Sequence, residues 1–271
     1  MQTDRVFLTA EWRHLAMLNY AVDPLLLQPF VPAGTELDFF GNRAYVSLVG
    51  FRFLDTKVLG IPIPFHRDFD EVNLRFYVRR NTGSEIRRGV VFIREVVPKG
   101  AIAAIARWAY NENYVALPMW HQIATDRVSY GWGDNCKMEL APAEEPSLPA
   151  EGSEEQFIAE HYWGYTAQRG GGSIEYKVVH EPWRLRRAAS ARFEGDATSL
   201  YGREFAQILT RPPDSALLAE GSLIQVMRGN PVGPGFQPAA AIVGGAAGEY
   251  ASSHAAPKPG GSPKGRPHGG D

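Results

Sequence analysis

The amino-acid sequence predicts an α+β fold of mainly antiparallel strands, arranged as a curved sheet or partly closed β-barrel with helices packed outside. Segments in which polar and apolar residues alternate occur in pairs joined by short turns, which is the pattern of antiparallel hairpins. Helical patterns are inserted among these pairs and do not alternate one-for-one with strands, which is typical of α+β proteins. With 271 residues and an apolar fraction of 44%, the chain is able to bury a core.

Composition separates a folded domain from a tail. Residues 1–228 contain no repeat and no Pro/Gly-rich linker long enough to divide two cores, so we expect one domain there. Residues 229–271 hold 11 of the 28 glycines and 7 of the 20 prolines, and their large apolar residues are few. Such a segment cannot bury enough apolar surface to fold, so we expect a disordered Gly/Pro/Ala-rich tail.

The first elements expected along the chain are a short helix and two hairpins. Asp23 followed by Pro24 is an N-cap residue with proline at the first helical position, and the helix must end before Pro32. Gly41-Asn42 is a turn signal between two strand-like segments, and the sequence NTGSE joins two others. The expected strands are residues 37–40, 43–53, 71–80 and 88–97.

Helical and strand patterns then follow each other to the end of the domain. Residues 101–110 have apolar residues near helical spacing. Residues 153–156 have the Ser-x-x-Gln form of a capping box, which predicts a helix from about 154 to 163. Asp196 is the expected N-cap of a last helix that runs to Leu209. The expected strands here are residues 123–130, 137–140, 174–180, 183–193 and 222–227.

Charge and composition exclude several classes of partner and cofactor. The formal charge is −2, from 28 basic and 30 acidic residues that are scattered along the chain, so we expect no nucleic-acid partner. The single cysteine, Cys136, excludes an internal disulfide and a multi-cysteine metal site. No histidine pair has metal-ligand spacing and no phosphate-binding or dinucleotide-binding motif occurs, so we expect neither a metal nor a cofactor. No apolar stretch reaches the roughly 20 residues that span a membrane and no export signal is visible, so the cytoplasm is the expected location.

The strand expected at residues 71–80 carries the strongest candidate site. A strand period of two places Glu71, Asn73, Arg75, Tyr77 and Arg79 on one face and apolar residues on the other. Two interpretations remain open: a sheet with one solvated side, or a polar wall inside a barrel. In the second case Arg75 holds a carboxylate through paired hydrogen bonds, Asn73 is a further ligand contact, and Glu71 is a candidate catalytic acid or base if burial raises its pKa.

Arg94 and Glu95 are adjacent charges in the strand expected at residues 88–97. The same period places Arg94 on the apolar face of Phe92 and Glu95 on the other face. Because a charge on an apolar face needs a partner, Arg94 is expected either to form a structural bridge to a carboxylate such as Glu71 or to contact a ligand.

Four further residues are candidate ligand contacts, each with a structural alternative. His66 lies in a loop before the polar strand, where plain exposure is the alternative. Asn111 and Glu112 follow a predicted helix, where helix capping is the alternative, and Glu112 is also a possible partner for an arginine. His161 lies on the apolar side of the helix predicted after Ser153, where a histidine is commonly a core residue bonded to a backbone carbonyl.

Four long segments also carry a family likeness. Residues 11–20 (EWRHLAMLNY), 44–80, 106–118 (ARWAYNENYVALP) and 160–166 (EHYWGYT) resemble the YqjF-like proteins of unknown function. That family is grouped by fold with acetoacetate decarboxylase. The resemblance therefore implies a cone-shaped antiparallel barrel whose interior holds a pocket.

The resemblance implies a difference in chemistry as well. Acetoacetate decarboxylase forms a Schiff base through a reactive lysine in a Pro-Lys-Lys segment. The nearest match here is residues 118–120, which read Pro-Met-Trp, and no Lys-Lys pair occurs in the chain. Lys99, the one lysine between residues 62 and 121, stands between proline and glycine, as in a turn. Glu71 resembles an active-site glutamate of the decarboxylase.

These observations lead to three hypotheses about function. The first is a protein that binds a small organic acid or other metabolite in its pocket, without Schiff-base decarboxylase activity. The second is an enzyme that performs acid–base, lyase-like chemistry on a small carboxylate with Glu71 and Arg75. The third is a non-catalytic scaffold that forms a homo-oligomer through its sheet edges.

Overall fold

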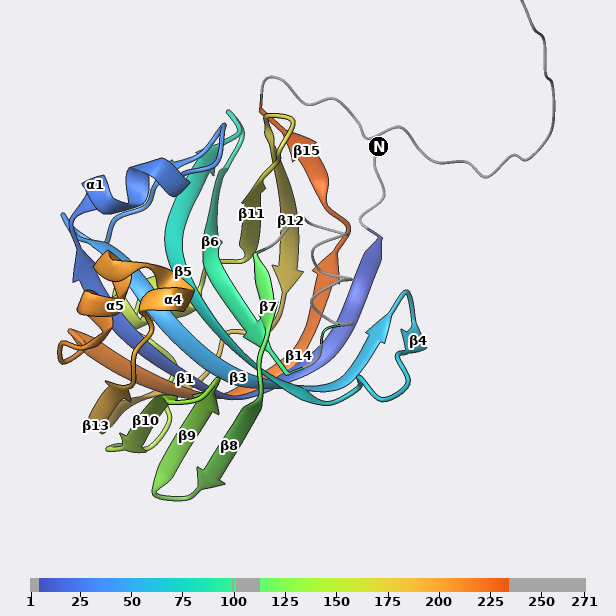
Figure 1. Ribbon diagram of the computed structural model, residues 1–271. Coiled ribbons are helices and arrows are strands. Elements are labelled where there is room, and N and C mark those ends of the chain that lie inside the picture. The colour runs from blue at the N-terminus through green and yellow to red at the C-terminus, as the bar shows by residue number, and fades with distance from the viewer. Residues whose placement is uncertain (1–4, 99, 101–112, 234–271) are drawn as a thin grey trace, which may run out of the picture. The chain divides into compact units, whose positions relative to one another are not determined.

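The computed structural model describes residues 5–98, 100 and 113–233 and is mostly β-sheet with a few short helices (Figure 1). The helix expected at residues 101–110 lies outside the described residues. In the described part, no helix is long and apolar enough to cross a membrane. The described helices are α1 (Pro24–Leu27), the 3₁₀ helix η1 (Gln28–Phe30), α3 (Glu154–Ala159), α4 (Thr198–Tyr201) and α5 (Arg203–Leu209).

A closed ring of strand pairings organises the fold. It closes because β12 pairs with β14 as well as with β11. In order round the ring the strands are β14 (Ser215–Met227), β1 (Val6–Val22), β3 (Ala44–Val58), β5 (Phe69–Asn81), β6 (Ile86–Val97), β11 (Trp163–Ala167) and β12 (Ser173–Val179).

The ring is uneven, because its pairings differ in length. From β14 to β6 the neighbouring strands are antiparallel and pair over most of their length. By contrast, β6 and β11 are parallel and share two residue pairs, and β12 and β14 also share two. Four short strands pair at its margins: β2 (Glu36–Leu37), β4 (Ile61–Pro62), β7 (Tyr114–Ala116) and β15 (Asn230–Val232).

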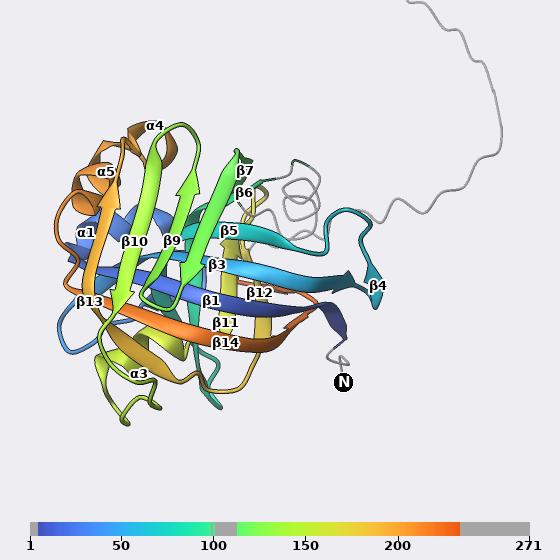
Figure 2. The ribbon, with the colours of Figure 1, turned by 90° about the horizontal axis from the view of Figure 1, so that it is seen from below.

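A second layer of strands covers part of the outer face of the ring. The sheet continues from β14 through β13 to β10, β9 and β8, and Figure 2 shows β8, β9 and β10 crossing over β1 and β3. These strands are β8 (Met119–Ala124), β9 (Arg127–Trp132), β10 (Cys136–Pro142) and β13 (Leu185–Glu194).

The strands β1, β3 and β5 are therefore buried on both faces, and their alternate residues belong to two apolar clusters. The outer cluster lies between the ring and the second layer and includes Leu18, Leu48, Leu74, Tyr130, Met138 and Phe205. The inner cluster lies inside the ring and includes Leu15, Met17, Val49, Phe51, Tyr77 and Phe157. Buried on both faces, such strands bury more apolar area per residue than a sheet with one wet side.

The helices differ from the expectation in position and length. Phe157 and Ile158 of α3 belong to the inner cluster. The expectation that the helices pack outside the sheet is therefore wrong for α3. Ser153 caps α3 by accepting a hydrogen bond from the Gln156 backbone at 3.2 Å, as the capping box predicts. The helix ends at Ala159 rather than near 163, because Trp163 is already the first residue of β11.

The last predicted helix is divided in two. Asp196 does accept a hydrogen bond from the Thr198 backbone at 2.9 Å at its start. Gly202, however, has φ of +82°, a left-handed conformation that ends α4 before α5 begins. Both helices contribute apolar side chains to the outer cluster.

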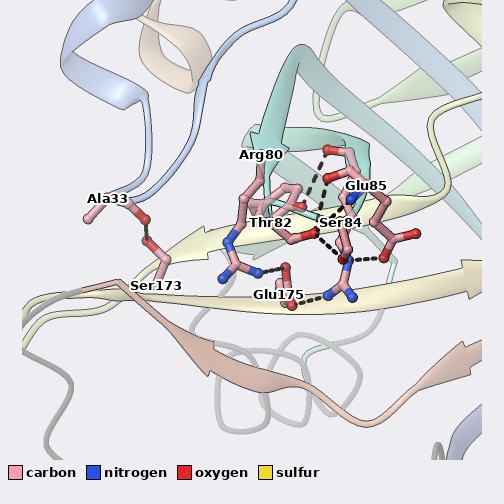
Figure 3. A network of polar contacts seen from close by, with 9 residues as sticks. Ala33, Arg80, Thr82, Ser84, Glu85, Ser173 and Glu175 are labelled. Carbon is pink, nitrogen blue, oxygen red and sulfur yellow. Dashed lines mark hydrogen bonds and ion pairs between the residues drawn. The ribbon is translucent and has the colours of Figure 1, made fainter.

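A polar network ties β12 to the turn between β5 and β6 (Figure 3). Glu175 of β12 is buried and accepts hydrogen bonds from Arg80 at 2.7 Å and from Arg87 at 2.6 Å, one on each carboxylate oxygen. The guanidinium of Arg87 also lies 4.2 Å from the centroid of the Trp163 ring on β11. These contacts link β5, β6, β11 and β12 where the ring has few backbone pairings.

Part of the segment expected as a tail is a strand. Asn230–Val232 form β15, which pairs with β12 through three residue pairs, and Val232 is buried. The residues from 234 onward lie outside the described part of the chain.

Candidate functional site

A cavity of about 140 Å³ lies inside the ring. All of the ring strands contribute side chains to its lining, and most of those side chains are apolar. Polar groups gather in one region of the wall. This region holds Glu71, Asn73 and Arg75 from β5, Glu95 from β6, Tyr114 from β7 and His161 from the loop after α3. Thr56, His66, Tyr176 and His180 are further polar side chains of the lining.

The strand β5 brings three of the predicted site residues to the cavity. As the period of two predicts, Glu71, Asn73, Arg75 and Tyr77 share a face, and the opposite face belongs to the outer cluster. From Glu71 to Tyr77 the polar face is not a solvated side of the sheet, because these four residues are buried and the first three line the cavity. The interior placement is therefore the correct one of the two alternatives. Arg79, the last residue predicted for this face, is partly exposed and pairs with Glu36.

Glu71 is a buried carboxyl with two hydrogen-bond partners. Its side chain accepts hydrogen bonds from the Asn73 amide at 3.0 Å and from the Tyr114 hydroxyl at 3.1 Å, one on each oxygen. Burial raises the pKa of Glu71 to about 7, although these hydrogen bonds and the charge of Arg75 act in the opposite direction. Near neutral pH, Glu71 therefore exists in both protonation states.

Arg75 is a buried cation that lacks a carboxylate partner. It is 9% exposed, and it forms no ion pair with any described residue. Its Nη2 donates to the Ile158 carbonyl at 3.4 Å, its guanidinium lies 5.8 Å from the Tyr77 ring centroid, and its Nε has no hydrogen-bond partner. The Asn73 Oδ1 atom nearby in the strand also accepts no hydrogen bond. Since guanidinium groups in proteins normally use several donors, Arg75 retains capacity for an anion.

His161 is held by a buried carboxylate. Its Nε2 donates to Asp38 Oδ2 at 3.1 Å, and Asp38 in turn forms an ion pair with Arg88 at 2.8 Å. Burial lowers the pKa of His161, and the contact with Asp38 does not offset that effect. Burial acts to raise the pKa of Asp38, but its hydrogen bonds from His161 and Arg88 lower it overall. His161 is thus a neutral imidazole fixed in the cavity wall by the Asp38–Arg88 pair.

Arg94 is not part of the site, and its predicted orientation is wrong. A register shift between β5 and β6 reverses the alternation of side chains at this point in β6, so that Glu95 lines the cavity and Arg94 does not. Arg94 instead donates to the Leu200 carbonyl at 3.2 Å and to the Asn113 side chain at 3.1 Å. It has a structural role that joins β6 to α4.

Of the three remaining predicted ligand contacts, one lines the cavity and two lie outside the residues that the structure describes. His66 lines the cavity from the loop after β4, and its Nδ1 lies 2.8 Å from the Pro64 carbonyl oxygen. Asn111 and Glu112 lie outside the described residues.

Aromatic side chains form the apolar part of the wall. Trp12 lies 5.0 Å from Phe51, 5.7 Å from Phe53 and 6.2 Å from Trp183, measured between ring centroids. The His180 ring stacks on Trp183 at 4.0 Å. Burial lowers the pKa of His180, and the nearby charge of Arg75 adds to the effect. The aromatic wall and Arg75 are thus close together.

Sequence reasoning missed four of the polar residues, Asp38, Glu95, Tyr114 and His180, and most of the aromatic wall. Asp38 is the one charge among the apolar residues between Leu37 and Phe40, which is a signal for a buried acid with a partner. Tyr114 and His180 carry no comparable signal, because tyrosine and histidine are common at strand ends. Their places depend on β7 and on the segment after β12, which approach the cavity from distant parts of the chain.

Comparison with known proteins gives a family for the whole domain. The model of the DUF2071 family, described as an uncharacterized conserved protein, matches residues 9–222. The chain belongs to this family. The uncharacterized protein YqjF of Bacillus subtilis (strain 168) is 25% identical over 215 residues, which are 76% of this chain and 84% of YqjF. The YqjF-like resemblance is thereby confirmed.

Solved structures show where the fold of this DUF2071 protein occurs elsewhere. Acetoacetate decarboxylase from Legionella pneumophila matches with a TM-score of 0.61 at 13% identity, covering 86% of this chain and 90% of that one. The enduracididine biosynthesis enzyme MppR complexed with pyruvate gives 0.59 at 11% identity, with 85% and 91% covered. An acetoacetate decarboxylase-like enzyme from Sphingomonas wittichii RW1 gives 0.57 at 10% identity, with 84% and 94% covered. At these identities the likeness establishes the fold alone.

The described side chains of the DUF2071 protein offer neither a lysine nor a metal site in the cavity. No lysine is present among the described residues that line it. Lys57 and Lys137 pair with Asp55 and Glu139 on other surfaces, each at 2.6 or 2.7 Å. No group of three His, Cys, Asp or Glu residues in the described ranges is arranged to hold a metal ion. Burial raises the pKa of Cys136 to about 11, so its thiol is inert near neutral pH.

Proposed function

We propose that this DUF2071 protein binds a small carboxylic acid inside its ring, which acts as a barrel-shaped pocket, with Arg75 as the group that holds the carboxylate. The observation that carries the proposal is a buried guanidinium, in the wall of a largely apolar cavity, that forms no ion pair with any residue the structure describes. Burying a charge without a partner is costly, and an anion beside Arg75 reduces that cost. The guanidinium matches the planar geometry of a carboxylate, which adds directional preference.

Glu71 supports a proton-dependent version of this binding. A pKa of about 7 means that Glu71 readily keeps a proton when a second carboxylate enters. In the neutral form Glu71 does not repel the ligand, and its hydroxyl is able to donate a hydrogen bond to the ligand. We therefore expect binding to be stronger below pH 7 than above it.

We expect that no ligand forms a Schiff base with a lysine in this pocket. The chain has six lysines, and none of those described lies in the cavity wall. Treatment with pyruvate and borohydride should accordingly leave the mass of the intact protein unchanged. A reduced adduct on Lys99 or on any other lysine would contradict this part of the proposal.

The test of Arg75 is calorimetric titration with acetate, pyruvate and benzoate. Arg75→Gln removes the charge and keeps a polar side chain, and we expect the affinity for every carboxylate that binds to fall about tenfold to a hundredfold. Arg79→Gln is the matched control, because Arg79 lies on the same strand but pairs with the exposed Glu36 at 2.8 Å. Equal loss in both variants, or no loss in Arg75→Gln, would contradict the role of Arg75.

The second candidate function is acid–base catalysis on the bound acid. The observation that favours it is the pKa of Glu71, since a group that titrates near the operating pH is suited to moving protons. An assay for turnover of a metabolite mixture should then lose activity in Glu71→Gln. Activity unchanged by that substitution would exclude Glu71 as the acid or base.

A further inference from the structure

The polar part of the cavity wall is narrow, and aromatic residues flank it. On β3 the residues paired with Phe69, Glu71 and Asn73 of β5 are Phe53, Phe51 and Val49. Directly paired residues on one face of an antiparallel sheet have Cβ atoms about 5 Å apart. Phe51 therefore lies beside Glu71 on the cavity side.

The aromatic lining continues across the next strand. Trp12 of β1 pairs with Phe53 of β3, and its ring packs against Phe51 as well. The ring of Trp12 then reaches Trp183, on which His180 is stacked. A chain of flat surfaces thus begins beside Glu71 and ends at His180, which lines the same cavity as Arg75.

Arg75 itself has an aromatic neighbour on the other side. The residue paired with it on β6 is Phe92, which also lines the cavity. Any group that extends from a carboxylate held by Arg75 consequently meets flat apolar side chains and few polar ones. Those polar groups include the carboxyls of Glu71 and Glu95, which disfavour a second negative charge on the ligand.

The size of the cavity sets the size of that extending group. A cavity of about 140 Å³ is similar to the engineered apolar cavities of ~150 Å³ that accept benzene. The space is therefore larger than a three-carbon keto acid such as pyruvate needs. It suits one six-membered ring with a single carboxylate.

We propose that the ligand is an aromatic monocarboxylate, a carboxylic acid on one planar apolar ring, rather than a small aliphatic keto acid. This inference rests on the proposed function, in which Arg75 holds the carboxylate, and it adds the identity of the rest of the molecule. The ring packs against Phe51, Trp12 and Phe92 by edge-to-face and offset contacts, as aromatic side chains do with one another.

The experiment compares benzoate, pyruvate and benzamide by calorimetric titration of the full-length protein at pH 6. Benzoate has both the ring and the charge, pyruvate has the charge with a small body, and benzamide has the ring without the charge. We expect benzoate to bind at least about tenfold more tightly than pyruvate, because it buries several more apolar carbons. Arg75→Gln should lower the affinity for benzoate by about tenfold and the affinity for benzamide by less than about threefold.

A substitution in the aromatic wall separates the ring contact from the charge contact. Phe51→Leu should lower the affinity for benzoate more than the affinity for pyruvate, since it removes a flat surface and leaves Arg75 in place. Phe30→Leu is the control, because Phe30 packs on Phe205 outside the cavity and should leave both affinities unchanged. Thermal melting of each variant identifies any loss of folding, and the comparison is made only between folded proteins.

The outcomes separate the two proposals. If pyruvate binds as tightly as benzoate and both depend on Arg75, the aromatic ligand is excluded and the carboxylate site stands. If Phe51→Leu weakens both ligands equally, the ring contact is excluded in the same way. If no carboxylate binds, or if binding does not depend on Arg75, both proposals are overturned.

Discussion

At the level of single residues, the cavity joins a carboxyl that holds a proton easily with a guanidinium that cannot lose one. Glu71 and Arg75 lie on the same face of β5, two strand periods apart. Arg75 lowers the pKa of Glu71, yet burial has the larger effect and keeps that pKa near 7. The pair is therefore not a closed salt bridge, and each group remains available to a third partner.

The raised pKa of Glu71 makes the stability of the protein depend on pH. The folded state binds a proton at this site up to about pH 7, whereas the unfolded state releases it near 4.5, so the contribution is complete below 4.5 and is lost as the pH rises through 7. We expect the native protein to lose on the order of 3 kcal/mol of unfolding free energy between pH 4.5 and 8 relative to Glu71→Gln. Urea unfolding of both proteins across this range measures it, and a constant difference would contradict the assignment.

The sequence was sufficient to predict which residues of β5 share a face, but not which residues surround them. Alternation alone places Glu71, Asn73 and Arg75 together, because the side-chain period of a strand is fixed. Alternation does not show whether the polar face is exposed to solvent, since that depends on the apolar residues of β1 and β3 that enclose this face. Tyr114 reaches Glu71 only because β7 lies beside β6, and no local pattern encodes such an approach.

At the level of elements, β6 illustrates why register cannot be read from a local period. One shifted residue between the β5 and β6 ladders exchanges the directions of Arg94 and Glu95. A bulge of this kind has no marker in the sequence FIRE of residues 92–95, which contains neither glycine nor proline. The starts of the helices were predicted better, because Ser153 and Asp196 accept hydrogen bonds from backbone N–H groups of the first turn.

The pairing of β6 with β11 is a weak point of the ring and depends on glycine. Gly89 pairs with Trp163, and a Cβ atom at Gly89 would lie 2.6 Å from the Trp163 carbonyl oxygen. We expect Gly89→Ala to lower the free energy of unfolding by about 1 to 3 kcal/mol, because backbone atoms must move apart.

Gly170 provides the control for that substitution. An added Cβ there meets nothing within 4 Å, so Gly170→Ala should change the stability by less than about 0.5 kcal/mol. Urea unfolding compares the two variants with the native protein. Equal stability of Gly89→Ala and Gly170→Ala would mean that the close approach of β6 and β11 is not needed for folding.

At the level of the whole molecule, the antiparallel character of the fold follows from its hairpins, but the closure of the ring does not. The long ladders from β1 to β6 join segments that are neighbours in sequence or carry clear alternation. The closing contacts of β12 with β14 and of β6 with β11 are two residue pairs each and join remote segments. Such pairings are selected by the packing of the inner cluster, which local propensity does not describe.

The last described strand, β15, gives a prediction at this scale. A chain that stops after residue 237 keeps β15 and should unfold at the same urea concentration as the full chain. A chain that stops after residue 228 lacks β15 and the buried Val232, and we expect it to lose about 1 to 3 kcal/mol of unfolding free energy. Equal stability of the two truncated chains would show that β15 adds nothing to the fold.

The two apolar clusters that share β1, β3 and β5 have a consequence for how this family can diversify. On each of these strands, alternate residues contact different neighbours, so the outer residues keep their contacts with the second layer when one inner residue changes. A single change of charge or shape inside the ring then leaves the outer half of the core intact. New ligand preferences can accordingly evolve one inward-facing position at a time, each variant being a folded protein on which selection can act.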